Sequence, residues 1–141
     1  MLTPVVVALI YQETTSLIFV ASFLITGLFG LALWLPAKKA NTEIRLHEGF
    51  IIVASFWVVL ALFGALPFFL LPELGLSVTN AVFESTSGLT TTGATILTGL
   101  DELPRSLLFY RQQLQWLGGL GIVVLAVALL PILGVGGMRL Y

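Results

Sequence analysis

The chain has no cysteine and few charged residues. Without cysteine among its 141 residues, disulfides and thiolate metal sites are excluded, while the redox compartment stays open. Charged residues make up 9%, well below the roughly 25% of a soluble domain. The formal net charge of −1 provides no basic surface for nucleic acid. A single histidine and scattered acidic residues suggest no nucleophile–base pair, so we expect no enzyme and no catalytic residue.

Apolar residues are abundant, at 58% of the chain. A chain this short has too little interior to bury them all, so part of this surface must face lipid. About 20 apolar residues cross the hydrocarbon core as a helix. Charge-free segments of that length predict spanning helices at residues 15–35, stopped by Pro36, and 49–71, closed by Pro67 and Pro72. A longer charge-free region at residues 112–138 predicts a third span at about residues 106–130. Met1–Tyr11 is apolar but barely half a span. The expected fold is an all-α membrane protein.

Basic residues indicate the orientation in the membrane. Residues 36–48 form the most polar stretch, a short aqueous connection that contains Lys38, Lys39 and Arg45. Short cytoplasmic loops carry an excess of lysine and arginine, so we place this loop in the cytoplasm. Residues 73–105 then face outside. We divide the chain into residues 1–48, the N-terminal helices with their cytoplasmic connection, and residues 49–141, a helix–pore loop–helix unit.

Between the second and third spans lies a segment too polar to cross the membrane. Residues 77–87 can make about three helical turns, with Ser77 or Thr79 as N-cap and Gly88 as the C′ residue. Residues 88–100 are rich in threonine and glycine, which are poor helix formers. A short helix followed by irregular chain, between two spans, predicts a re-entrant pore loop.

The loop sequence Thr90–Thr95 has the composition of a cation filter. Irregular backbone at membrane depth must line a cavity or pack in protein, because lipid cannot satisfy its polar groups. Carbonyl and hydroxyl oxygens replace the water around a cation without fixed charge. We predict ion-binding carbonyls at Thr91, Thr92, Gly93 and Ala94, with K⁺ held through Thr91, Thr92 and Gly93. The alternative is a threonine-rich external loop without function.

Four further residues are expected to support this filter: Thr90, Thr95, Glu84 and Arg111. Glu84 either pairs with Arg111 or Arg105, or accepts N–H bonds from the loop, or is a solvated outer carboxylate. Arg111 is either buried against the loop or extends to the outer membrane interface.

Two other features predict helix packing rather than ligand binding. Residues 118–121, Gly-Gly-Leu-Gly, complete no dinucleotide-binding motif, and small residues let membrane helices approach closely. Trp57 lies too deep in its span for an interfacial aromatic belt, so we expect it to pack against another helix.

Four stretches of the sequence resemble the Trk-type potassium uptake transmembrane subunits of bacteria, the TrkH family. They are HEGF at 47–50, FESTSGLTTTGAT at 83–95, FYRQQLQWLGG at 109–119 and LPILGVGG at 130–137. The resemblance implies potassium uptake across the bacterial inner membrane by a multi-pass protein. It also implies four helix–pore–helix repeats in one polypeptide. The expected partners are a second copy in a homodimer, membrane lipid and a cytoplasmic nucleotide-binding Trk regulatory subunit, with no nucleic acid.

The resemblance places this chain at the first repeat, with Gly93 matching its filter glycine. Relatives with serine at that glycine tend to pass sodium. No covalently bound cofactor is implied, and potassium is the transported substrate. One loop supplies a quarter of a filter, so either the chain belongs to a longer transporter or four copies assemble. The alternative function is that of a non-conducting fragment or structural membrane subunit.

Overall fold

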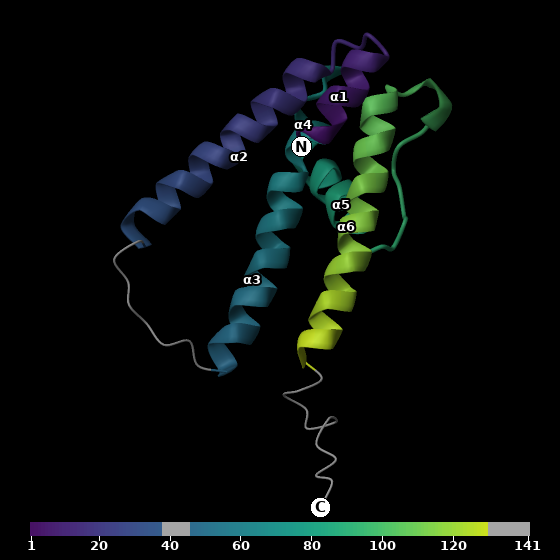
Figure 1. The fold of residues 1–141 in the computed structure, drawn as a ribbon. Helices are drawn as coiled ribbons and strands as arrows, with labels where there is room; N and C mark the ends of the chain where they lie inside the picture. Colours follow the sequence, from purple (N-terminus) through teal and green to yellow (C-terminus); the bar gives the residue numbers. More distant parts are fainter. Residues whose placement is uncertain (38–45, 130–141) are drawn as a thin grey trace, which may run out of the picture.

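The computed structural model describes residues 1–37 and 46–129, and in these parts the chain folds into helices without a strand (Figure 1). In chain order the elements are α1 (Thr3–Ile10), α2 (Ser16–Ala37), α3 (Leu46–Gly64), α4 (Leu66–Leu70), η1 (Pro72–Leu74), α5 (Val78–Leu89), η2 (Leu100–Glu102) and α6 (Arg105–Leu129). The predicted cytoplasmic charges Lys38, Lys39 and Arg45 lie outside the described residues.

The long helices agree with the predicted spans. Two apolar segments of the described chain, Ser16–Ala37 and Phe50–Leu70, are long enough to cross a membrane. Helix α6 has 25 residues, which corresponds to about 37 Å of helix. Pro36 was expected to stop the first span but lies inside α2. The expected all-α architecture is therefore confirmed for the described residues, with two apolar segments of spanning length.

The second predicted span is not one continuous helix. Helix α3 ends at Gly64 and α4 begins at Leu66, with Pro67 in its first turn. Proline lacks an N–H group, and its ring would clash with the carbonyl four residues earlier, here that of Phe63. Pro67 therefore interrupts the helix, and the chain bends before it enters the polar segment.

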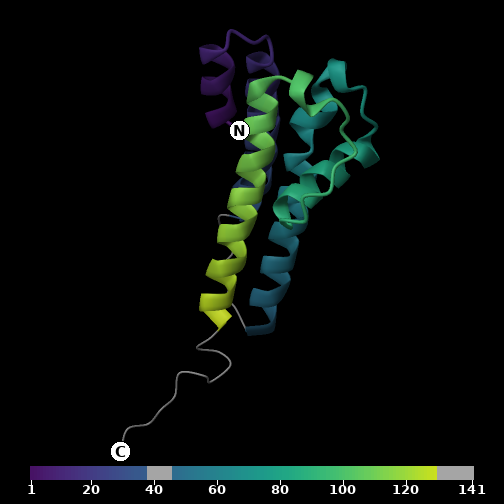
Figure 2. The same ribbon diagram turned by 90° about the vertical axis from the view of Figure 1, so that its right-hand side faces the viewer.

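The chain reverses direction at both ends of the molecule. The connection between α1 and α2 lies at the same end as the start of α6, whereas the start of α3 lies at the opposite end (Figure 1). Helix α2 slants away from α3 in this view. Helix α5 packs against both α3 and α6. The segment after α5 returns beside it to the end where α6 starts (Figure 2).

A buried apolar cluster joins α2, α4, α5 and α6. Its residues are Phe19, Ala65, Phe68, Leu71, Ala81, Leu89, Leu107, Tyr110 and Leu114. Tyr110 is central, because its ring contacts Phe19 and Phe68 at centroid distances of 5.4 and 5.5 Å. Its hydroxyl donates a hydrogen bond to the Gly64 carbonyl over 2.9 Å, which satisfies a backbone group at the α3 break. The cluster thereby holds α5 between α4 and α6.

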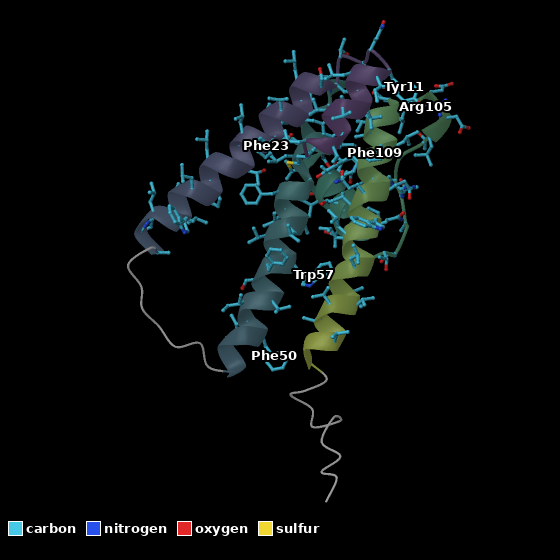
Figure 3. All side chains as sticks on the ribbon, in the orientation of Figure 1. Tyr11, Phe23, Phe50, Trp57, Arg105 and Phe109 are labelled. Carbon is cyan, nitrogen blue, oxygen red and sulfur yellow. The ribbon has the colours of Figure 1, made fainter. Side chains whose placement is uncertain are left out.

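Glycines bring α6 close to its neighbours, as predicted. A Cβ atom at Gly118 would lie 1.9 Å from the Leu89 carbonyl oxygen, and one at Gly121 would lie 2.9 Å from the Trp57 ring. Trp57 therefore packs against α6, in agreement with its expected packing role. Trp57 and Phe23 also line an apolar cavity of about 470 Å³ among α2, α3 and α6, and both are labelled in Figure 3.

Candidate ion-binding site

Helix α5 begins where the sequence indicates but ends later. The Ser77 side chain accepts a hydrogen bond from the Asn80 N–H group over 3.2 Å, so Ser77 is the N-cap and Thr79 lies inside the helix. The expected C′ role of Gly88 is wrong, because α5 continues to Leu89. Gly88 instead faces α6, where an added Cβ atom would lie 3.1 Å from that of Leu114. Close packing explains this glycine.

The left-handed backbone conformations fall after the helix, at Thr91 and Gly93. Their φ angles are 56° and 74°. Glycine adopts such angles readily, whereas a residue with a Cβ atom pays roughly 1–2 kcal/mol. Three backbone bonds hold this turn: Thr90 N–H to the Thr86 carbonyl at 2.8 Å, Thr91 N–H to Gly88 at 3.0 Å and Thr92 N–H to Ser87 at 3.0 Å. These bonds offset the strain at Thr91.

Beyond this turn the chain has no helical structure until η2. Residues Thr90–Thr95 are exposed, in contrast to the buried residues Ser87–Leu89 just before them. Asp101 and Glu102 lie in η2, near the start of α6. The loop therefore presents one face to its surroundings and the other to α5 and α6.

The four predicted filter carbonyls differ in their hydrogen bonds. Within the described residues, no hydrogen bond reaches the carbonyls of Thr91 and Thr92. The Gly93 carbonyl accepts a bond from Arg111 Nη2 at 3.3 Å, and the Ala94 carbonyl accepts one from Ser87 Oγ at 2.6 Å. A carbonyl oxygen has two lone pairs, so each of these keeps one further acceptor position. Thr91 and Thr92 are the carbonyls with most capacity for a cation.

Glu84 and Arg111 form a buried ion pair behind the loop. The Arg111 Nε atom lies 3.2 Å from Glu84 Oε2, and the exposed fractions of the two residues are 8% and 0%. The other carboxylate oxygen, Oε1, accepts bonds from the Thr95 hydroxyl and the Ile96 N–H group, both at 2.6 Å. The structure thus shows the Arg111 pairing and N–H bonding considered for Glu84, rather than a solvated carboxylate. Arg111 is buried against the loop rather than extended to an interface.

Of the other predicted residues, Thr90 bonds within the turn after α5, whereas Arg105 bonds to Glu13. The Thr90 hydroxyl bonds to the Thr86 carbonyl and to the Thr92 hydroxyl, both at 2.8 Å, so it stabilises the turn. Arg105, the other candidate partner of Glu84, lies elsewhere: its backbone N–H group donates to Glu13 Oε1 at 2.6 Å.

Ser87 belongs to the site although the sequence interpretation omitted it. A useful signal was its spacing, since residues three apart on a helix share a face and Ser87 follows Glu84 by three.

A second polar cluster lies at the start of α6, around Glu13, which precedes the first predicted span. There the Glu13 carboxylate accepts bonds from the N–H groups of Arg105 and Ser106 and from the hydroxyls of Ser106 and Thr15. Burial raises the pKa of Glu13, but these hydrogen bonds outweigh it and lower the pKa below its ordinary value of 4.5. Glu13 therefore ties the α1–α2 connection to the first turn of α6 (Figure 3, near Tyr11 and Arg105).

The comparison with known proteins identifies the family. The cation transport protein family TrkH matches residues 15–141. The chain belongs to the TrkH family. It is 55% identical over its full length to the Trk system potassium uptake protein TrkH of Escherichia coli K12, and 45% identical to TrkG of that organism. It is 39% identical to TrkI of Halomonas elongata.

These TrkH-family relatives are considerably longer than the chain. It spans 29% of the two Escherichia coli proteins and 28% of the Halomonas protein. Their names describe potassium uptake rather than an enzyme, in agreement with the expectation from the sequence. The resemblance noted from the loop motifs is confirmed at the level of the family.

Proposed function

We propose that this chain supplies the first of four pore loops in a longer potassium uptake protein, called the parent transporter below. Two observations support the proposal. The curated relatives are named potassium uptake proteins, and the chain matches only 29% of the length of the first of them. The structure adds an exposed threonine–glycine loop whose other side is bonded to α5 and α6.

In this proposal the loop at 90–95 is re-entrant, and its carbonyls coordinate potassium. Thr91 and Thr92 offer carbonyls without another bond in the described residues, and Gly93 and Ala94 contribute their remaining lone pairs. Helix α5 ends next to these oxygens, so the negative end of its macrodipole favours a cation there. The proposal rests above all on the carbonyl oxygens of the turn that follows α5.

Glu84 and Arg111 keep this site close to electroneutral. An unpaired arginine behind the filter would repel the cation, but the Glu84 carboxylate lies 3.2 Å from the guanidinium and compensates its charge. The same pair fixes both sides of the loop, since Arg111 contacts the Gly93 carbonyl and Glu84 contacts Thr95 and Ile96. We assign both residues a supporting role rather than direct ion binding.

The proposed setting is the bacterial inner membrane. Residues 36–48 would lie in the cytoplasm and residues 73–105 outside. The start of α3 and the start of α6 lie at opposite ends of the molecule, which supports this orientation (Figure 1). The proposed partners are the remaining three repeats of the parent transporter, a second copy in a homodimer and a cytoplasmic nucleotide-binding Trk regulatory subunit. The Trk system named for the relatives supports that membership.

Gly93→Ser in the parent transporter tests the filter assignment. An added Cβ atom at Gly93 meets only Gln115 Nε2, at 3.5 Å, so the space is open. The φ of 74° disfavours a side chain, so the substitution should act through the carbonyl geometry. We expect the ratio of rubidium to sodium uptake to fall by about tenfold, which corresponds to roughly 1.4 kcal/mol. Uptake is measured in a strain that lacks its own potassium transporters.

Gly99→Ser is the matched control. Gly99 also has a positive φ, 64°, in the same loop but beyond the filter residues, and the site of an added Cβ atom is similarly open. It should retain the uptake ratio of the unchanged protein. An unaltered ratio in a Gly93→Ser protein that reaches the membrane would remove the filter assignment.

The second candidate function is a non-conducting or structural membrane subunit, which the incomplete match to the relatives favours. An experiment on the isolated chain distinguishes one part of a longer transporter from an assembly of four copies. Reconstituted in liposomes, residues 1–141 alone should give negligible potassium flux, because one loop provides a quarter of a filter. Robust flux would instead indicate that four copies assemble.

A further inference from the structure

Ser87 contacts three consecutive residues of the loop. Its backbone carbonyl accepts bonds from the N–H groups of Thr92 at 3.0 Å and Gly93 at 3.4 Å. Its side-chain Oγ donates to the Ala94 carbonyl at 2.6 Å. One residue near the end of α5 thus bonds to the peptide group before Gly93 and to the peptide group between Ala94 and Thr95.

The direction of the Ser87 hydroxyl is unusual for a helix. A serine inside a helix commonly bonds its own helix, to the carbonyl four residues earlier, which costs little. Ser22 and Thr26 of α2 bond in this way, to Ile18 and Ser22 respectively, each at 2.8 Å. Ser87 instead reaches forward by seven residues, into the loop. With 6% of its surface exposed, it makes this bond away from competing solvent.

Two side chains therefore hold adjacent loop carbonyls from behind. Arg111 contacts the Gly93 carbonyl at 3.3 Å, and Ser87 contacts the Ala94 carbonyl at 2.6 Å. The shorter bond is the one from Ser87. The Ala94 carbonyl belongs to the peptide group between Ala94 and Thr95, and the Gly93 N–H group is also bonded to Ser87. Because both ends of the Gly93–Ala94 segment are held, the rotation available to the glycine, the most permissive residue of the turn, is limited.

We infer that Ser87 is a positioning residue that sets the ion preference of the loop by fixing the Ala94 peptide group. The inference rests on the proposed function. Discrimination between monovalent cations depends on the number and spacing of the coordinating oxygens. A loop free to turn at Ala94 can contract around a smaller cation, whereas a loop held by Ser87 keeps its spacing. Loss of the hydroxyl should thus favour sodium.

Ser87→Ala in the parent transporter tests this inference. We expect the ratio of rubidium to sodium uptake to fall by about two- to tenfold, the factor that corresponds to one hydrogen bond. Ser85→Ala is the matched control, since the Ser85 hydroxyl is equally buried on α5 but has no hydrogen-bond partner among the described residues. It should leave the ratio unchanged. Membrane levels are measured for each variant, so that the ratio is compared only among proteins that reach the membrane.

Ser87→Cys keeps the test open if Ser87→Ala fails to accumulate. A thiol has nearly the same shape but is a weak donor, so the uptake ratio should again fall. An unchanged ratio in whichever of these variants accumulates would overturn the inference. If Gly93→Ser alters the ratio while the Ser87 variants do not, the positioning role alone is wrong. If neither alters it, the filter assignment itself fails.

Discussion

Two glutamates tie distant parts of the chain to α6, and they do so by different means. Glu13 contacts the start of α6 and is partly exposed. Among the described residues it accepts bonds only from neutral groups, two backbone N–H groups and two hydroxyls. Glu84 is fully buried and accepts bonds from a hydroxyl, an N–H group and the Arg111 guanidinium.

The difference follows from the cost of removing charge from water. A carboxylate that keeps contact with solvent needs only donors, and the N-terminus of a helix provides N–H groups with a favourable dipole. A carboxylate at 0% exposure needs an opposite charge, because burying an unpaired ion is far more expensive. The cluster at Glu13 should therefore tolerate neutralisation, whereas the pair at Glu84 should not.

Breaking the buried pair should have the largest effect. Glu84→Gln leaves the Arg111 charge buried without a counter-ion, and removal of one partner of such a pair typically costs about 3–5 kcal/mol. We expect a strongly lowered melting temperature of the parent transporter in detergent and loss of potassium uptake. The double variant Glu84→Gln/Arg111→Met should recover part of the melting temperature, because it removes both charges. A double variant no more stable than Glu84→Gln would contradict the role of charge compensation.

Separating α5 from α6 should weaken the Glu84–Arg111 ion pair and leave the contacts of Glu13 unchanged. Gly118→Ala would place a Cβ atom 1.9 Å from the Leu89 carbonyl oxygen, so the end of α5 must move. Overpacking of this kind costs about 1–3 kcal/mol. In Gly119→Ala the nearest atom is Thr91 Cγ2 at 3.9 Å, which makes it a matched control. Equal melting temperatures for the two variants would show that the close approach at Gly118 does not hold the loop.

Neutralising Glu13 should have the smallest effect. Glu13→Gln keeps the acceptor oxygen but removes the charge at the start of α6, for which about 1 kcal/mol or less is expected. The folded pKa of Glu13 is lowered, so its stabilisation is present above the ordinary value of 4.5 and is lost as the pH falls through the folded value. The melting temperatures of the unchanged protein and of Glu13→Gln should therefore converge below pH 4.5. A gap that stays constant would mean that the charge of Glu13 is not involved.

The sequence predicted those features that depend on hydropathy and local chemistry. Charge-free runs located α2 and the segment at 50–70 to within about two residues, and a third charge-free region indicated α6. Ser77 was one of two residues proposed as the cap of α5. The threonine and glycine content after a short helix predicted the irregular segment that follows α5, and Glu84 and Arg111 were selected because they are ionisable residues near it. These signals are local, so a single sequence carries them.

The features that it did not predict depend on neighbours in space. A glycine at position 88 is typical of a helix end, but Gly88 lies inside α5 and packs against Leu114. Pro67 and Pro72 were expected to close the second span at about residue 71, but the break between α3 and α4 within that span was not anticipated, because the hydropathy pattern is continuous there. The choice of Arg111 rather than Arg105 as the partner of Glu84 required the position of α6 beside α5. Ser87 was overlooked because its contact is with a backbone carbonyl, so that only its spacing from Glu84 on the helix pointed to the site.

Within the described residues, the side of the loop that faces α5 and α6 is held by residues of these two helices. Ser87, Glu84 and Arg111 all lie within the same helix–loop–helix unit as the carbonyls that they hold. In a ring built from several such units, each quarter would then carry its own adjusting residues. Substitutions behind one loop could change that quarter alone, so duplicated repeats would be free to diverge and the ring to lose its symmetry step by step.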